Sequence, residues 1–475
     1  MANEQLIIAY SEYLNTLNIH VLRNLARQAG VYKPTDGKKD SLIERTVNVL
    51  TGKVAPCPPS TRGAPLKDDA LDPKYFRELE RIREDYEMDG DTGYAAGPES
   101  AGEAAPEAEP EDPLHRGCLE LLPNGGGMVR ARNCAPTPGK DLFVSKQNLA
   151  AWGLREGDRV TGTAAPAANS TLLELTAVRT VNGSPDYAER KAFEDFAPCY
   201  PDEKIELSAE NGLLSLRYID LFAPVGKGQR ALLCEPPGTD APAIMRDILQ
   251  ALRRKAAKNE NLRVFFLLLG ECPEEVTEYM EDGTDDVVYT TFEKSAADHL
   301  RAARLVFAQA ERLAEGGGDA VILLDSLTRL TLAASDACPR DSETLPCGLR
   351  KGCFDFPRLC LSKARNLRGA GSVTVIARLG ADEGSSLDSA LLAEYGKICN
   401  CRISLSGRMA QAGARSVVDV KRSGTRRAEK LLSDAEAACV ARVQASMLND
   451  EGQSLYAMMK QSPDNTFFIG STAKY

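Results

Sequence analysis

The segment LLCEPPGTDAPAIM, residues 232–245, has the order of a phosphate-binding loop: an apolar run, a turn rich in proline and glycine, and then a helical segment. Such a loop binds phosphate because its glycines expose backbone N–H groups, a lysine neutralises the phosphate charge and a Ser or Thr hydroxyl holds Mg²⁺. No lysine is present in this turn, which reads Gly238, Thr239, Asp240, Ala241 and Pro242. The segment is either a phosphate loop that has lost its chemistry or a turn that never had any.

The nearest basic residues lie too far along the chain to replace the missing lysine. Lys227 precedes the strand, Lys255 lies far down the following helix, and Arg246 lies more than one turn into that helix. Asp240 brings a carboxylate to the position of the phosphates, and like charges about 4 Å apart repel by about 4 kcal/mol in a partly screened site. Pro242 lacks a backbone N–H, although proline fits the start of a helix. We therefore expect the loop to be inactive in catalysis.

The elements around the loop predict an α/β domain over residues 190–475. The runs ALLCEPP, RVFFLLLGE, DAVILLDS and SVTVIARLG are continuously apolar, as in buried parallel strands, and helical segments such as SAADHLRAARLVFAQAERLAE separate them. Ligands in such sheets bind beyond the carboxyl ends of the strands. Glu235, Glu271 and Asp325 fall at those ends and are candidate site residues.

Three further segments precede this domain. Residues 1–51 show helical spacing of apolar residues and predict a small helical module. Residues 52–115 are acidic and rich in Pro, Ala and Glu, cannot bury a core and are predicted to be a mostly disordered linker. Residues 116–184 contain short strand-like runs between turn signals and predict a small antiparallel barrel. Such a barrel is a common nucleic-acid platform, and a purely structural barrel would show the same pattern.

Composition excludes several classes of protein. The chain has 475 residues and a net charge of -10, which argues against a protein that coats nucleic acid and leaves room for a local basic surface. It has no apolar run long enough to span a membrane and no signal peptide at its start, so we expect a cytoplasmic location. Its 13 cysteines are scattered singly, which predicts buried thiols and no zinc site.

Seven segments resemble, in order and spacing, the family of the bacterial transcription termination factor Rho. They read GCLELLPNGGGMVR, DLFVSKQNLAAWGLREGDRVTG, APVGKGQRALL, PEEVTEYM, VILLDSLTRL, KARNL and RSGTR. The resemblance covers about residues 116–470 and, more loosely, the helical module. It implies a multidomain fold with an OB/cold-shock-like RNA-binding barrel and a RecA-like P-loop NTPase domain. The family members are hexameric, RNA-dependent ATPases and helicases.

The resemblance assigns roles in the nucleotide site. It implies that Glu271 orients the attacking water, that Asp325 positions Mg²⁺ and that Arg365 is an arginine finger for a neighbouring subunit. It also implies ATP and Mg²⁺ as cofactors. The family's Gly-Lys-Thr corresponds to Asp240-Ala241-Pro242, and an arginine corresponds to Cys272. The remaining nucleotide-binding positions that it implies are Gly226, Lys227, Gly228, Gln229, Arg230, Gly238 and Thr239.

The resemblance also assigns positions for single-stranded RNA, which proteins hold by aromatic stacking and positive charge. Arg130 and Phe143 match such positions in the barrel, whereas Met128 stands where a stacking ring is expected. In the ring's central channel, Ser386 replaces a lysine, and Arg350 and Lys351 keep positive charge. The implied partners are single-stranded RNA, RNA polymerase and further subunits, in a homo-hexameric ring or a ring mixed with an intact Rho.

These observations predict a member of the family with weak RNA binding and without efficient ATP hydrolysis, acting as a non-motor paralogue or modulator. Two alternatives remain open. One is a working termination ATPase with an atypical loop. The other is a structural ring partner without an RNA role.

Overall fold

The computed structural model describes residues 114–472, with gaps at 132–133, 138, 167–171, 188, 209–211, 281–286, 415–416 and 447–452, together with Leu79 and parts of residues 10–51. The chain divides into two compact units, Met1–Pro113 and Leu114–Tyr475, which we describe separately. Within the described residues, no helix is both long enough and apolar enough to cross a membrane.

The first unit contains the helices α2 (Ile19–Gln28) and α3 (Lys39–Leu50). Their apolar faces meet in one buried cluster, to which Leu22, Leu25 and Leu42 contribute. The predicted linker 52–115 lies outside the described residues, except for Leu79 and its last two positions.

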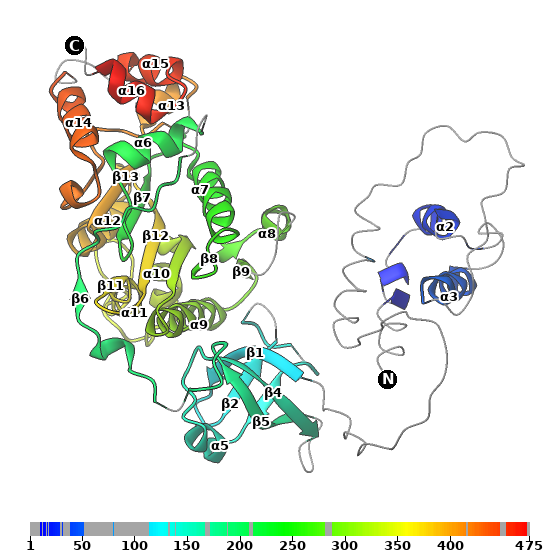
Figure 1. Cartoon of the computed structure of the whole chain (residues 1–475). Helices are drawn as coiled ribbons and strands as arrows, with labels where there is room; N and C mark the ends of the chain where they lie inside the picture. Colours follow the sequence, from blue (N-terminus) through cyan, green and yellow to red (C-terminus); the bar gives the residue numbers. More distant parts are fainter. Residues whose placement is uncertain are drawn as a thin grey trace, which may run out of the picture. The chain divides into compact units, whose positions relative to one another are not determined.

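The second unit begins with a closed barrel, as the strand-like runs predict (Figure 1). The barrel differs from the predicted all-antiparallel one in a single pair of neighbours, the third and fifth strands, which pair in parallel. Its strands are β1 (Leu114–Leu121), β2 (Gly127–Arg130), β3 (Leu142–Val144), β4 (Arg159–Pro166) and β5 (Leu173–Val181), with the helix α5 (Lys146–Ala151) after β3. The strand order around the barrel is β1-β2-β3-β5-β4. Alternate residues such as Leu119, Val160 and Val181 point inward and form the barrel core. Arg116, Arg159 and Thr161 therefore lie on its outer surface.

A nine-stranded sheet follows, with the order β14-β13-β7-β12-β10-β8-β9 and with β11 and β6 attached beside β12. The strands are β6 (Pro198–Cys199), β7 (Arg230–Glu235), β8 (Leu262–Glu271), β9 (Val287–Thr291), β10 (Asp319–Asp325), β11 (Arg365–Leu367), β12 (Ser372–Gly380), β13 (Cys401–Ser404) and β14 (Gly424–Thr425). The strands from β13 to β9 pair in parallel, which confirms the predicted α/β fold. Because they are parallel, the carboxyl ends of β7, β12, β10 and β8 share one edge.

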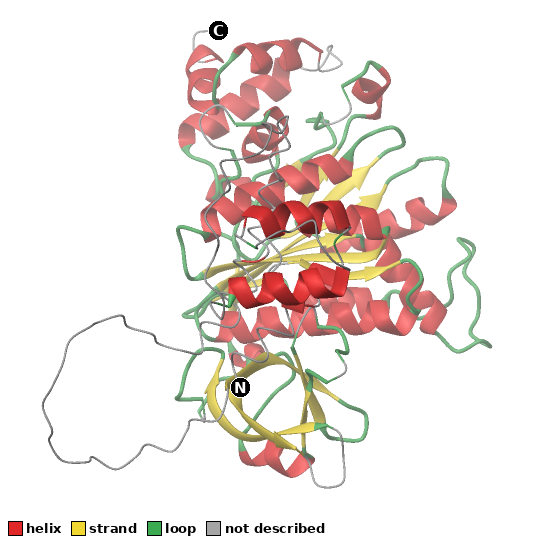
Figure 2. Cartoon of the chain, turned by 90° about the vertical axis from the view of Figure 1, so that its right-hand side faces the viewer, coloured by secondary structure: helices red, strands yellow, loops and turns green. Residues whose placement is uncertain are grey.

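Helices cover both faces of this sheet (Figure 2). They are α6 (Leu214–Phe222), α7 (Ala241–Ala256), α8 (Pro273–Met280), α9 (Ala296–Glu315), α10 (Leu327–Ala337), α11 (Asp355–Ser362), α12 (Ser386–Ile398), α13 (Gly407–Gln411), α14 (Asp434–Ser446), α15 (Gln453–Gln461) and α16 (Asn465–Thr472). One apolar cluster contains Ile244 of α7, and a second contains Leu305 of α9 and Leu330 of α10.

The barrel is attached to the α/β domain through α9. Gly157, in the turn before β4, has a φ of 83°, and a Cβ there would lie 2.4 Å from the carbonyl carbon of Ala308. Only glycine allows this backbone conformation and this close approach. Arg155 also donates two hydrogen bonds to Glu315, at 3.2 and 2.9 Å. The turn and the helix therefore form a close-packed junction.

A buried arginine ties the C-terminal helices to the domain. Arg217 of α6 is 3% exposed and donates hydrogen bonds to the carbonyl oxygens of Met459, Ser462 and Asp464 at 3.0, 2.6 and 2.9 Å. The carbonyls of Met459 and Ser462 lie at the end of α15, where helix geometry leaves carbonyl groups short of donors, and that of Asp464 directly precedes α16. Arg217 thus holds the end of α15 and the start of α16 together.

Candidate nucleotide site

The predicted phosphate loop forms a short turn between β7 and α7. The backbone N–H and the hydroxyl of Thr239 both donate to the carbonyl oxygen of Pro236, at 3.3 and 2.6 Å. Gly238 has a φ of 80°, which glycine adopts without strain. The turn is therefore closed on itself by its own hydrogen bonds.

The N–H groups at the start of α7 are bound by carboxylates of the same chain. Asp240 caps the helix and accepts a hydrogen bond from the N–H of Ala243 at 3.1 Å. Glu235, at the end of β7, accepts one from the N–H of Ala241 at 3.3 Å. Pro242 has no N–H to offer. Carboxylates thus take the donors that a phosphate would need at a helix N-terminus.

Arg378 lies at the carboxyl edge of the sheet, near the end of β12, between the acidic ends of three strands. Its Nε lies 2.7 Å from Oδ1 of Asp325, and its Nη1 and Nη2 lie 3.3 and 3.8 Å from Glu235 and Glu271. The side chain of Arg378 is 14% exposed and that of Asp325 is 2% exposed. Sheet order explains the contact, because β12 lies between β7 and β10 and brings Arg378 beside both acids.

A second arginine holds Glu271. Arg329 of α10 forms an ion pair with Glu271 and also donates to the carbonyl oxygen of Leu269 at 3.1 Å. Burial raises the pKa of Asp325, and the charges of Arg378 and Arg329 oppose that rise. The two predicted catalytic acids are therefore both engaged by arginines of the same chain. Cys272 follows Glu271 and its carbonyl oxygen accepts from the first turn of α8.

These residues do not fit a triphosphate with its Mg²⁺. The loop has no cation, and four carboxylates border this edge, from Glu235, Asp240, Glu271 and Asp325. The described residues contain no group of three or more His, Cys, Asp or Glu side chains arranged to hold a metal ion. Among the described residues, the cations beside Glu271 and Asp325 are Arg329 and Arg378, and both are paired with these acids.

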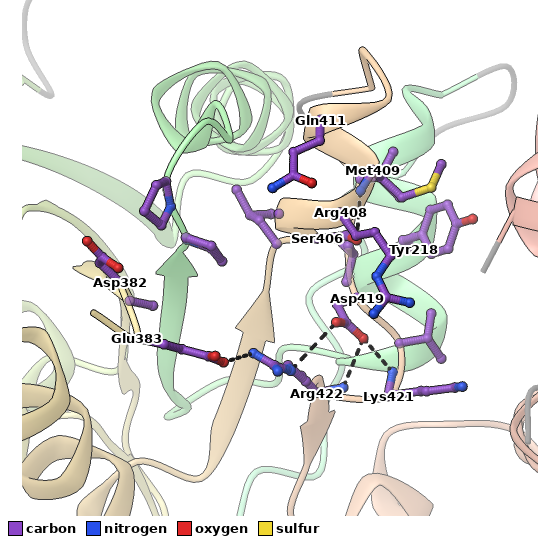
Figure 3. A pocket seen from close by; sticks show the side chains of 18 of the residues that line it. Tyr218, Asp382, Glu383, Ser406, Arg408, Met409, Gln411, Asp419, Lys421 and Arg422 are labelled. Carbon is purple, nitrogen blue, oxygen red and sulfur yellow. Dashed lines mark hydrogen bonds and ion pairs between the residues drawn. The ribbon is translucent and has the colours of Figure 1, made fainter. Parts of the chain in front are cut away.

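A cavity of about 780 Å³ opens beside the loop (Figure 3). Pro236 and Pro237 border it, and Glu383 lies across from Arg422. Nη1 of Arg422 lies 2.5 Å from Oε1 of Glu383. The backbone N–H of Arg422 also donates a hydrogen bond to the carboxylate of Asp419 at 3.2 Å. The basic side of the cavity is thus partly neutralised by its acidic side.

The segment Gly226–Arg230 lies at the opposite edge of the sheet, where β7 begins, so the structure does not bring it together with the loop of the same chain. Lys227 pairs with Glu203 and Asp319 at 2.6 and 2.8 Å. The N–H of Gly228 and the side chains of Gln229 and Arg230 make hydrogen bonds within the domain, to Thr374, Asn400 and two backbone carbonyls.

Arg365, the predicted arginine finger, also lies near that edge, on β11, which pairs with the start of β12. Its Nε donates to the carbonyl oxygen of Ser362 at 2.8 Å, and its guanidinium lies 5.6 Å from the ring centre of Phe193. Within one chain it is separated from Asp325 by the length of the sheet.

In the barrel, the cation of Arg130 is already paired. It lies 2.5 Å from Glu120 and 2.8 Å from Asp141, and its side chain is 10% exposed. Asp141 also accepts from the N–H of Thr137 at 2.7 Å, so the pair fixes the loop before β3. Arg130 therefore has a structural role that its sequence context did not reveal. Met128 and Phe143 are register partners on β2 and β3 and both are half-buried.

The predicted channel residues lie in two separate segments of the chain. Ser386 is the first residue of α12 and is exposed. Arg350 donates to the carbonyl oxygen of Cys338 at 2.9 Å, and Lys351 pairs with Glu343 at 3.0 Å. The Lys351 pair is exposed and contributes little to stability.

The sequence interpretation missed Arg378 and Arg329. One signal for Arg378 was available: it interrupts the apolar run SVTVIARLG of a strand predicted to be buried. A buried charge needs a partner, so an arginine near the end of a buried strand indicates an acidic site at that edge.

Comparisons with known proteins agree with this architecture. The description "Rho termination factor, RNA-binding domain" matches residues 115–186, and "ATP synthase alpha/beta family, nucleotide-binding domain" matches residues 215–425. The chain is 35% identical to "Transcription termination factor Rho" of Streptosporangium roseum over 347 residues, covering 72% of this chain and 88% of that protein. It is 35% identical to that of Streptomyces coelicolor, covering 74% and 84%, and 32% identical to that of Borreliella burgdorferi, covering 75% and 70%. The chain belongs to the transcription termination factor Rho family.

Proposed function

We propose that this chain is an RNA-binding member of the Rho family that does not act as an ATP-driven motor. The observation that carries the proposal is the ion pair between Arg378 and Asp325. It places a cation of the chain itself on the acid that the family resemblance assigns to Mg²⁺. The proposed role is to bind RNA and to modulate transcription termination, alone or within a ring of Rho-family subunits.

Two features of the phosphate loop support the loss of nucleotide turnover. Asp240 and Glu235 bind the N–H groups at the start of α7, so a phosphate would have to displace them. It would also meet their negative charge, since Ala241 supplies no cation. Binding energy spent on breaking these contacts is not available for catalysis.

The barrel surface around Phe143, on β2 and β3, favours RNA binding of reduced strength. One aromatic ring remains there, beside Met128, and each stacked base contributes about 1–3 kcal/mol. Arg130 is paired with two acids and would have to leave them to reach a phosphate. RNA affinity then depends on other positive groups of the chain.

The test is to measure MgATP binding and RNA binding on the same preparation of the full chain. A fluorescent ATP analogue and a labelled, cytosine-rich single-stranded RNA serve as probes. We expect RNA binding without nucleotide binding. A variant with Asp240→Gly, Ala241→Lys and Pro242→Thr tests the loop, since gain of nucleotide binding by this variant would show that the loss is local.

Two results would contradict the proposal. Saturable MgATP binding by the natural chain would favour a working termination ATPase with an atypical loop. Absence of RNA binding would favour a structural ring partner.

A further inference from the structure

A second cavity, of about 290 Å³, lies at the junction between the barrel and the α/β domain. Its barrel side is formed by the outer surface of β1, β4 and β5, and its other side by α9 and the start of β8. It is on the opposite side of β1 from β2 and β3, and so it is separate from the barrel surface that carries Met128 and Phe143. We call it the junction groove.

Three arginines line the junction groove: Arg116 from β1, Arg159 from β4 and Arg263 from β8. None of its lining residues is Asp or Glu, in a chain whose net charge is -10. Arg116 and Arg159 are exposed, and neither side chain makes a hydrogen bond or an ion pair with any residue that the structure describes. This differs from the nucleotide site, where the arginines are paired with acids.

The groove also offers neutral hydrogen-bond donors in a fixed arrangement. Thr161 is the register partner of both Arg116 on β1 and Thr180 on β5, so the three side chains form a row across the strands. The hydroxyls of Thr161 and Thr180 have no hydrogen-bond partner among the described residues. The nearest turn is held against α9 by Gly157, so the two walls keep their spacing.

From this arrangement we infer that the junction groove binds phosphate groups of the backbone of single-stranded RNA. Guanidinium groups match phosphate geometry with two parallel N–H donors, and hydroxyls complete such sites. The inference rests on the proposed function and deepens it, because it locates the positive charge that the paired Arg130 does not provide.

The composition of the groove predicts recognition of the backbone without recognition of the bases. Phe265 is the one aromatic residue that lines it and is 3% exposed, so no ring is available for stacking. Binding here should therefore depend strongly on salt and weakly on sequence.

The test compares the full chain with a variant carrying Arg116→Gln and Arg159→Gln. Both side chains are exposed and without partners among the described residues, so the variant should keep its thermal stability. The control is Arg179→Gln, which removes one exposed arginine from the bulge of β5 and does not line the groove. RNA binding is measured by fluorescence anisotropy with a labelled single-stranded RNA over a series of salt concentrations.

We expect the double variant to bind RNA about tenfold more weakly at about 0.15 M salt. The variant loses two phosphate contacts, each of which releases about 0.7 counterions from the RNA, and at this salt concentration that loss weakens binding by about this factor. The slope of log K against log salt should fall by about 1.4, and two RNAs of different sequence should lose the same factor. Arg179→Gln should leave the affinity within about twofold of the natural chain.

Four outcomes would overturn the inference. An unchanged affinity of the double variant, with the natural chain binding RNA, would refute the groove and leave the proposed function intact. An equal loss in Arg179→Gln would show a general charge effect. Broadening of the phosphorus resonance of inorganic phosphate by the natural chain and not by the double variant, with unchanged RNA affinity, would identify a site for small free anions. No RNA binding by the natural chain would refute the proposed function as well.

Discussion

The ion pair between Arg378 and Asp325 leads to a quantitative prediction for Arg378→Ala. The substitution leaves Asp325, which is 2% exposed, without its nearest cation, and an uncompensated buried charge typically costs about 3–5 kcal/mol. Arg329 remains and also stabilises the charged form of Asp325, so we expect the lower end of that range, about 3 kcal/mol. At about 3 kcal/mol per molar urea, the midpoint should fall by about 1 M.

The assay follows urea unfolding with two signals. Far-UV circular dichroism reports mainly on the helices of the α/β domain, whereas the fluorescence of Trp152, the one tryptophan, reports on the barrel. The midpoint from circular dichroism should fall and the fluorescence midpoint should change less. Arg378→Lys, which keeps the charge but loses the fork, should show an intermediate loss.

The pH dependence gives an independent check. Burial raises the pKa of Asp325 in the folded chain above its value in the unfolded chain. Ionised Asp325 therefore lowers the free energy of unfolding as the pH rises, and this loss disappears at low pH, where the carboxyl is protonated in both states. Removing Arg378 raises that pKa further. The stability difference between the natural chain and Arg378→Ala should therefore be smaller at about pH 5 than at about pH 7.5. A midpoint within about 0.2 M of the natural chain at both values would refute the reasoning.

Two further substitutions test the contacts that position the sites. Gly157→Ala should destabilise the barrel–α9 junction by roughly 1–3 kcal/mol, because φ is positive there and a Cβ would lie 2.4 Å from the backbone of Ala308. The measurement is the rate of proteolysis within residues 153–159, which should rise. Unchanged protease resistance would contradict the close packing at this junction. Arg217→Met should make the backbone amides of α15 and α16 exchange hydrogen faster, because three carbonyl oxygens at their connection lose the hydrogen bonds that Arg217 donates. Exchange equal to that of the natural chain would show that the arginine is dispensable.

The sequence predicts the architecture better than it predicts the contacts at the site. Continuous apolar runs such as RVFFLLLGE identify buried parallel strands, and alternating runs identify the barrel, because burial on two faces or on one sets these patterns. The missing lysine is also visible directly, since Ala241 cannot carry a charge. These features depend on residue type and local spacing alone.

The pairing of charges depends on strand order, which the sequence does not contain. Arg378 meets Asp325 because β12 lies beside β10, and Arg130 meets Glu120 because β1 lies beside β2. The sequence therefore predicts RNA binding for Arg130 without showing that this arginine is paired with acids inside the barrel. Lys227 shows the same limit, since a residue close to the loop in sequence lies at the other end of the strand in space.

The most direct test of the central claim is ATP hydrolysis by the purified full chain, with and without cytosine-rich single-stranded RNA. We expect no turnover above background in either condition, with RNA binding confirmed in the same sample. RNA-stimulated hydrolysis that disappears in Asp325→Asn would contradict it and would identify the chain as a working motor of its family.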